Sequence, residues 1–196
     1  TLWQREVLGS EDDPESAIAS QLKYWTDELA GLPDLLPLPT DHPRPARAST
    51  IGEAYEFALG SEIALRVDKT AREHNATVFM VVHSALAVLL ARLSGTDDIA
   101  IGTPTAGRGE EALDDLVGMF VNTLVLRTHV QGGLTFSELL SRTRDTDLAA
   151  FGHADVPFER LVESMGRTRS SAYSPLFQVM LTFQNAVSGT FALPGL

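Results

Sequence analysis

The residues with the most obvious capacity for chemistry are the five histidines of the chain, which are His42, His74, His83, His129 and His153. A histidine can serve as a general base or bind a metal ion. No pair of them has the i, i+4 spacing around a glutamate that zinc hydrolases use, and His153-x-Asp155 offers too few ligands for a metal site. We therefore expect no metal site, but a single histidine could still act as a general base, so the histidines alone do not decide whether the chain is catalytic. His83 lies in an apolar stretch and is predicted to be a paired histidine of the core.

A glycine-rich segment follows a predicted strand and has the glycine spacing of a phosphate-binding loop. It reads Gly102-Thr103-Pro104-Thr105-Ala106-Gly107-Arg108-Gly109. The lysine of that motif is missing, and Gly109 stands where a serine or threonine would bind magnesium. Pro104 also removes a backbone donor that a phosphate needs. The segment therefore argues against nucleotide binding.

Polar side chains interrupt two apolar stretches that are predicted to be strands. Asn122 and Thr123 break the run from 118 to 130 and point to opposite faces, because side chains alternate along a strand. An unpaired buried carboxamide costs about 1–3 kcal/mol, so Asn122 either pins a loop or faces a polar channel. In the stretch from 176 to 183, Gln178 lies on the polar face, which either meets solvent or lines a cleft.

Composition excludes several classes of protein. The chain has 196 residues, a formal net charge of −11, 44% hydrophobic residues and no cysteine. The negative charge argues against a nucleic-acid partner, and the apolar content predicts a folded core. The most apolar stretch, residues 78–90, is too short for a membrane span, which needs about 20 residues. We expect no signal peptide, no membrane association and a cytoplasmic location, and the start at Thr1-Leu2-Trp3 looks like the middle of a longer chain.

Local signals predict a mixed α/β layout with helices packed on a sheet. Helices are expected to start at Asp13-Pro14, at Ser61 as a cap, after Thr77, at the Thr135-x-x-Glu138 capping box and with Pro157 at the first helical position. Strands are expected at 53–59, 99–102, 118–130 and 176–183. Five prolines between 31 and 45 predict an extended strap on the surface, whose leucines pack on the body of the protein.

Five segments, in this order, resemble the C-terminal lobe of the condensation domains of nonribosomal peptide synthetases. They are Tyr24-Trp25 with 29–33; 101–108; 116–124 with Arg127; 155–162; and Ser174-Pro175 with 176–179. The resemblance covers essentially the whole chain. It implies a two-layer α/β sandwich lobe like that of chloramphenicol acetyltransferase, with a mixed sheet. Residues 1–196 would be this lobe, incomplete at its C-terminal end and without the N-terminal lobe.

The resemblance also implies an activity and partners. In that family a tunnel runs between the two lobes, and two carrier proteins deliver substrates on phosphopantetheine arms. The amine of the acceptor attacks the donor thioester and a peptide bond forms. Neighbouring synthetase domains are further expected partners, and this chain would bind no cofactor directly. The alternatives are a non-catalytic lobe that docks carrier proteins and an epimerisation domain of the same fold.

One departure from the family bears on activity. The catalytic signature His-His-x-x-x-Asp-Gly is absent, and in the family it lies on the N-terminal lobe. The isolated chain is therefore expected to be inactive, and His153 is expected to hold a loop. By resemblance, the residues expected near the tunnel are Asn122, Thr123, Thr103, Arg108 and Gln178. Asn122 would bind substrate or order the wall, and Arg108 would hold its loop or touch substrate.

Overall fold

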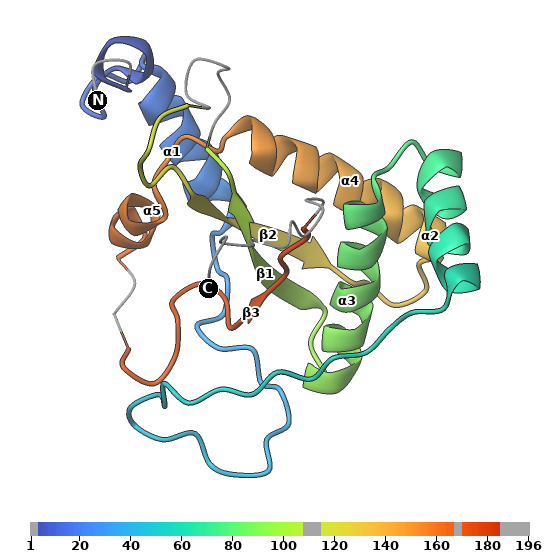
Figure 1. Cartoon of the computed structure of the whole chain (residues 1–196). Coiled ribbons are helices and arrows are strands. Elements are labelled where there is room, and N and C mark those ends of the chain that lie inside the picture. Colours follow the sequence, from blue (N-terminus) through green and yellow to red (C-terminus); the bar gives the residue numbers. More distant parts are fainter. Residues whose placement is uncertain (1–3, 108–114, 167–169, 185–196) are drawn as a thin grey trace, which may run out of the picture.

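The computed structural model describes residues 4–107, 115–166 and 170–184, and Arg108 lies outside these ranges. Within them, the chain forms a mixed sheet with helices packed on it, as predicted (Figure 1). The strands are β1 (Asp98–Thr105), β2 (Asn122–His129) and β3 (Val179–Met180), in the order β2-β1-β3. β1 pairs antiparallel with β2 and parallel with β3.

The helices are η1 (Gln4–Leu8), α1 (Ala17–Glu28), α2 (Ser61–Glu73), α3 (Val78–Ser94), α4 (Phe136–Gly152) and α5 (Phe158–Ser164). The two long helices form where the sequence predicts them. The Thr77 hydroxyl accepts a hydrogen bond from the Met80 amide and starts α3, and Gly95 ends it. Thr135 and Glu138 form the predicted capping box at the start of α4. These are local interactions, which explains why the sequence shows them.

Three predicted helix starts are wrong in detail. Ser16 caps α1 by accepting from the Ala19 amide, so Asp13-Pro14 lies in a turn before the helix. Gly60 is the N-cap of α2, and Ser61 is its first residue. Pro157 is the N-cap of α5, one position before the expected place.

Different helices pack on the two faces of the sheet. On β2, the Thr128 hydroxyl lies 3.5 Å from the His83 ring of α3, whereas the Arg127 guanidinium reaches the carbonyls that end α1. Because neighbouring side chains point to opposite faces, α3 covers one face and the end of α1 approaches the other. Figure 1 shows α1 and α5 beside the end of the sheet where β1 finishes and β2 begins.

The predicted strands differ most from the structure. β1 is longer than expected at 98–105, and β2 is shorter at 122–129. Residues 53–59 form no strand in the described chain, and only Val179 and Met180 of the stretch 176–183 are assigned to one. Leu176 has a φ of 68°, which interrupts the extended backbone just before β3. Strand formation depends on a neighbouring strand, which local sequence does not show.

The proline-rich strap lies on the surface, and three of its four leucines pack as predicted, whereas Leu35 is 37% exposed. Leu32 is buried, and Leu36 and Leu38 pack against a cluster of side chains from α3 and β1. Gln178 holds this strap: its Oε1 accepts a hydrogen bond from the Leu36 amide at 2.7 Å.

No single helix in the described part of the chain is long and apolar enough to cross a membrane. The pair α2 and α3 meets the test of length and composition together, but it bends by 105° at its break.

Candidate functional site

The candidate site lies at the end of the β1–β2 hairpin where Thr105 faces Asn122. The register pairs Thr103 with Leu124, Pro104 with Thr123 and Thr105 with Asn122. Thr103, Asn122 and Thr123, all expected near the tunnel, therefore lie at one end of the sheet. Gln178 lies farther along it, next to Val179, which pairs with Ile101.

The Asn122 carboxamide is fully used within the protein. Its Nδ2 donates to the carbonyls of Ala154 and Val156, both at 2.8 Å. Its Oδ1 accepts from the amides of Thr123 at 2.8 Å and Phe158 at 3.1 Å. A carboxamide has two N–H donors and one oxygen with two lone pairs, so no hydrogen-bonding capacity is left over. The structure thus shows the first of the two roles considered for Asn122, which is to pin a loop.

That loop, residues 154–158, is also held from the opposite side by α1. The Gln21 side chain donates to Asp155 Oδ2 at 2.7 Å and accepts from the Asp155 amide at 3.0 Å. Gln21 and Asn122 together fix the course of the backbone before α5 begins. The sequence shows no sign of this pairing, since Gln21 and Asp155 are 134 residues apart.

His153 closes the same region and has the structural role that was predicted for it. Its Nδ1 lies 2.7 Å from the Ala149 carbonyl, and its carbonyl accepts from the Trp25 indole at 2.7 Å. Its ring stacks on Tyr24 with 3.9 Å between ring centroids. Burial is the main reason why the pKa of the Tyr24 hydroxyl is raised to about 12, so Tyr24 stays neutral at physiological pH.

The three other described residues of the predicted tunnel set make internal contacts, two through their side chains and one through its amide. The Thr103 hydroxyl is buried and donates to the Leu181 carbonyl at 2.9 Å. Gln178 donates to the Asp34 and Ser174 carbonyls as well as accepting from Leu36. Thr123 is half-buried and gives its amide to Asn122. These contacts position backbone at the site.

The segment 102–107 and the segment that leads into β2, both part of the family resemblance, meet at this end of the sheet. Gly107 has a φ of 62°, and a Cβ on it would overlap the Phe120 carbonyl. Only glycine allows this close approach and favours this backbone conformation. The segment 102–107 is therefore held against the segment that leads into β2, beside the pinned 154–158 loop.

An exposed apolar surface borders the site. Within the segment before β2, Val117 and Met119 are 105% and 90% exposed, and Val121 is more than half exposed. We call these three residues the Val117–Val121 surface. Several exposed apolar side chains within five residues are a feature that binding surfaces and interfaces share.

Two pairs of titratable side chains lie deeper in the fold, and the sequence did not indicate the partner in either pair. His83 Nδ1 is 3.0 Å from Asp147 Oδ1, and both side chains are fully buried. Burial is the main cause that raises the pKa of Asp147, against the opposing effect of His83. His83 is therefore the paired core histidine expected from its apolar surroundings.

The second pair fixes the far end of the hairpin. Arg127 binds both carboxylate oxygens of Asp98 at 2.8 Å and donates to the Glu28 and Ala30 carbonyls. The hydrogen bond from Arg127 lowers the pKa of Asp98 below its ordinary value. Arg127 therefore ties α1 to the sheet and makes no contact with the candidate site.

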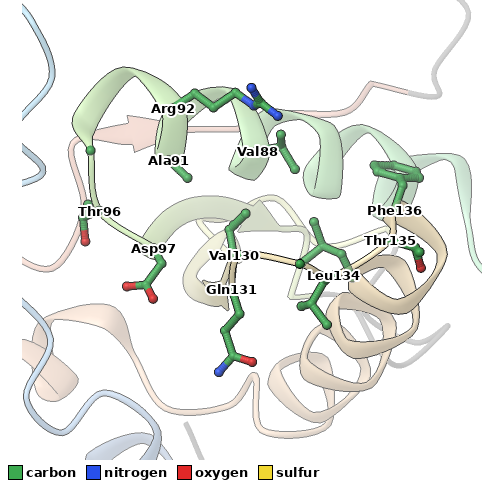
Figure 2. A pocket seen from close by; sticks show the side chains of 14 residues that line it. Val88, Ala91, Arg92, Thr96, Asp97, Val130, Gln131, Leu134, Thr135 and Phe136 are labelled. Carbon is green, nitrogen blue, oxygen red and sulfur yellow. The ribbon is translucent and has the colours of Figure 1, made fainter.

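A cavity of about 650 Å³ lies at this far end, between the end of α3 and the start of α4 (Figure 2). Arg92, Asp97, Gln131 and Phe136 are among its lining residues. It opens beside Asp97 and Val130, whereas Asn122 stands at the other end of the eight-residue β2. The cavity is therefore separate from the candidate site. The described residues contain no group of three or more acidic, histidine or cysteine residues that could hold a metal ion.

Comparison with known proteins decides the family. The sequence model of the family described as the condensation domain matches residues 2–192. This chain belongs to the condensation-domain family.

Two curated relatives are nonribosomal peptide synthetases. The chain is 53% identical over its whole length to the probable non-canonical nonribosomal peptide synthetase CymA of Salinispora arenicola and covers 2% of that protein. It is 51% identical over 193 residues to a dimodular nonribosomal peptide synthase of Bacillus subtilis, covering 98% of this chain and 8% of that one. The chain therefore spans only a small part of these relatives.

Solved structures confirm the fold. The crystal structure of the X-domain from teicoplanin biosynthesis superposes with a TM-score of 0.85 at 29% identity. It covers 91% of this chain, and this chain covers 40% of it. A four-domain nonribosomal peptide synthetase also gives a TM-score of 0.85, at 25% identity over 91% of this chain and 14% of that one. The predicted fold and family are thus confirmed, whereas the tunnel roles of the five residues stay predictions.

Proposed function

We propose that this chain is the C-terminal lobe of a condensation domain in a nonribosomal peptide synthetase and supplies one wall of its substrate tunnel. The observation that carries the proposal is the meeting of three family-like segments, 102–107, 118–124 and 154–158, at one end of the sheet. The exposed Val117–Val121 surface lies in the second of them. This end of the lobe is ordered by hydrogen bonds yet leaves an apolar surface uncovered.

The reaction in question is the aminolysis of a thioester. The amine of a carrier-bound aminoacyl acceptor attacks the donor carbonyl, a C–N bond forms, and the C–S bond breaks to release the phosphopantetheine thiol. One proton leaves the amine. Holding two tethered reactants in the correct geometry lowers such a barrier by up to about 7–11 kcal/mol. A lobe that contributes only a rigid, water-excluding wall fits this requirement.

The side chains of this lobe have positioning roles in the proposal. Asn122 orders the wall through the 154–158 loop and does not bind substrate, because its carboxamide has no unused donor or acceptor. Thr103 and Gln178 act in the same way on the backbone near β3. The proton acceptor would come from a His-His-x-x-x-Asp-Gly motif in the other lobe, which this sequence lacks.

The first test is an activity assay on the whole domain, expressed as one polypeptide that joins this chain to its flanking sequence. With cognate donor and acceptor carrier proteins loaded, we expect a carrier-bound dipeptide, detected by mass spectrometry of the released product. The isolated chain should give none. Failure of the whole domain to form the amide, with its upstream histidine motif intact, contradicts the proposal.

The second test asks whether Asn122 matters for turnover. Asn122→Ala in the whole domain should lower kcat with little change in the affinity for carriers, because the loop that it positions is displaced. Glu159→Gln, an exposed change on α5, is the matched control. Unchanged turnover in Asn122→Ala removes Asn122 from the candidate site. A product with inverted stereochemistry and no new amide bond would instead support epimerisation.

A further inference from the structure

A buried pair of titratable side chains has no part in the function proposed above. His83 of α3 and Asp147 of α4 are both 0% exposed, and Nδ1 of the ring lies 3.0 and 3.1 Å from the two carboxylate oxygens. Nε2 of the same ring lies 3.5 Å from the hydroxyl of Thr128 in β2, which is also buried. One contact in the core therefore joins two helices and a strand.

The stability of the fold does not account for this pair. Two ionisable groups lose their hydration when they are buried, and an apolar pair of similar volume is often equally stable or more stable. Burial raises the pKa of Asp147 despite the opposing effect of His83, so the ionised carboxylate is unfavourable there. Asp147 Oδ2 takes part in the hydrogen bond with Nδ1, whereas Oδ1 and the Thr143 hydroxyl, one turn earlier in α4, are buried without a hydrogen-bond partner among the described residues. Each such atom adds a further cost.

The pair instead fixes how two helices lie against each other. The buried face of α3 is largely apolar and includes Met80, Val81, Ala87 and Leu90. Apolar contacts have little directional preference, and a slide by one helical turn would move α4 by about 5.4 Å. Such a slide would separate His83 from Asp147 and leave a lone carboxylate in the core, which is strongly unfavourable. The pair therefore selects one position of α4 on α3.

The position of α4 determines the position of the loop at the candidate site. Asp147 lies near the end of α4, and the chain continues from that helix into the loop 154–158. Figure 1 shows α4 running toward the end of the sheet where β2 begins. There Asn122 holds the loop through hydrogen bonds with two carbonyls and one amide. The Phe79 ring of α3 also packs on Phe151 of α4, with 6.2 Å between ring centroids. A shift of α4 therefore moves the loop relative to Asn122.

We propose that His83 and Asp147 are positioning residues for the condensation reaction, because their buried pair fixes α4 against α3 and β2 and thereby holds the loop 154–158 in the wall of the tunnel. This inference rests on the proposed function, and it gives a role in the reaction to two side chains that contact neither the loop nor a substrate. An effect of the pair on stability alone would not meet it.

Hydrogen exchange followed by NMR tests the positioning in this chain without turnover. The Phe158 amide donates to Asn122, so its exchange rate reports whether the loop stays in place. Asp147→Ala should raise that rate at least about tenfold more than the rate of the Ile101 amide at the centre of β1. Thr135→Ala, at the opposite end of α4, lowers stability without touching the pair and should raise the two rates by the same factor. Equal factors in Asp147→Ala overturn the proposal.

A conservative variant and a matched control separate the contact from burial. Asp147→Asn keeps the shape of the side chain and an oxygen that accepts from Nδ1, so the Phe158 amide should exchange within about threefold of its wild-type rate. Thr143→Val removes another buried oxygen of α4 that is not part of the pair, and it should leave the Phe158 rate unchanged. Asp147→Asn exchange as fast as that of Asp147→Ala contradicts the proposal, as does accelerated exchange in Thr143→Val.

A double variant decides the question if Asp147→Ala does not fold. His83→Leu combined with Asp147→Leu leaves no lone charge in the core, so the chain is expected to fold. Its urea midpoint should stay close to that of wild type, while the Phe158 amide exchanges at least about tenfold faster. A stable double variant with wild-type exchange at Phe158 shows that the pair does not position the loop.

Turnover of the whole domain tests the link to the reaction. The double variant should lower kcat at least about tenfold with KM for the loaded carrier proteins within about twofold, because the change is confined to the wall of the tunnel. Unchanged kcat in a variant whose Phe158 amide exchanges fast overturns the role in the reaction. If the wild-type domain itself forms no amide, the proposed function fails, whereas the exchange measurements still decide whether the pair positions the loop.

Discussion

At the scale of single residues, the candidate site consists of side chains that hold backbone in place. Asn122 satisfies two carbonyls and two amides, and Gln21 donates to the carboxylate of Asp155 and accepts from its amide. Sequence analysis left two roles open for Asn122, because the decisive partners, Ala154 and Val156, lie 32 and 34 residues away. The residue type predicts that a buried carboxamide needs hydrogen-bond partners. Only the fold shows which groups are those partners.

We expect Asn122→Ala to lower the free energy of unfolding of the isolated chain by about 2–4 kcal/mol, since four hydrogen bonds are lost and at least two carbonyls lose a donor. Urea denaturation measures the change. Gln131→Ala is the control, because its exposed carboxamide accepts a single hydrogen bond, from Arg142; it should change stability by no more than about 0.5 kcal/mol. Equal effects of the two substitutions would contradict the role given to Asn122.

Asp98 should make stability depend on pH. Its hydrogen bond from Arg127 lowers its pKa from the ordinary value of 3.8, so the unfolded state binds a proton more readily than the folded state. The contribution of this carboxylate is therefore present above about pH 5 and is lost as pH falls through the folded-state pKa.

The comparison of wild type with Asp98→Asn isolates this group. At pH 6 the variant should be less stable by about 1–3 kcal/mol, the range for a hydrogen bond to a charged group. The difference should shrink steadily when urea titrations are repeated down to pH 3. If the difference in the free energy of unfolding between wild type and variant stays constant or grows as the pH falls, the result is inconsistent with a lowered pKa at Asp98.

At the scale of elements, the helices were easier to predict than the strands for a physical reason. The capping interactions of Thr77 and Thr135 involve residues three positions away, so the sequence contains the whole signal. A strand is stabilised by a neighbour that can lie anywhere in the chain. The stretches 53–59 and 176–183 have the correct alternation for strands, yet the described chain supplies no neighbouring strand for the first and only β1 for the second.

The capping box of α4 gives the prediction at this scale. Thr135→Ala removes the acceptor of the Glu138 amide and one of the two contacts with the Glu138 carboxylate. We expect a loss of about 1 kcal/mol in the free energy of unfolding. Ser141→Ala, at an exposed position within the same helix, is the control and should be neutral or slightly stabilising. If both substitutions are neutral, the cap contributes nothing to the stability of the fold.

At the scale of the whole molecule, this lobe combines an ordered core with two apolar surfaces that nothing in the described chain covers. The core contains fully buried side chains from helices and strands alike, including Trp25, Ile101 and Leu140. The uncovered surfaces are Val117–Val121 and residues 51–65. The family and the fold could be predicted from ordered motifs, but the extent of these surfaces could not, because exposure depends on what the rest of a domain covers.

The difference between lobe and whole domain should be visible with a dye that fluoresces on apolar surface, such as anilinonaphthalene sulfonate. The isolated chain should bind it with clear fluorescence at pH 7 while keeping its near-ultraviolet circular dichroism, which excludes a molten globule as the source. The whole domain should give markedly less fluorescence per mole, because in the proposed assembly the rest of the domain would cover both surfaces. Combining Phe57→Asp with Val117→Asp in the isolated chain should lower its signal toward that of the whole domain. If the whole domain binds as much dye as the isolated chain, these surfaces face water in both, and the assembly inferred from them is wrong.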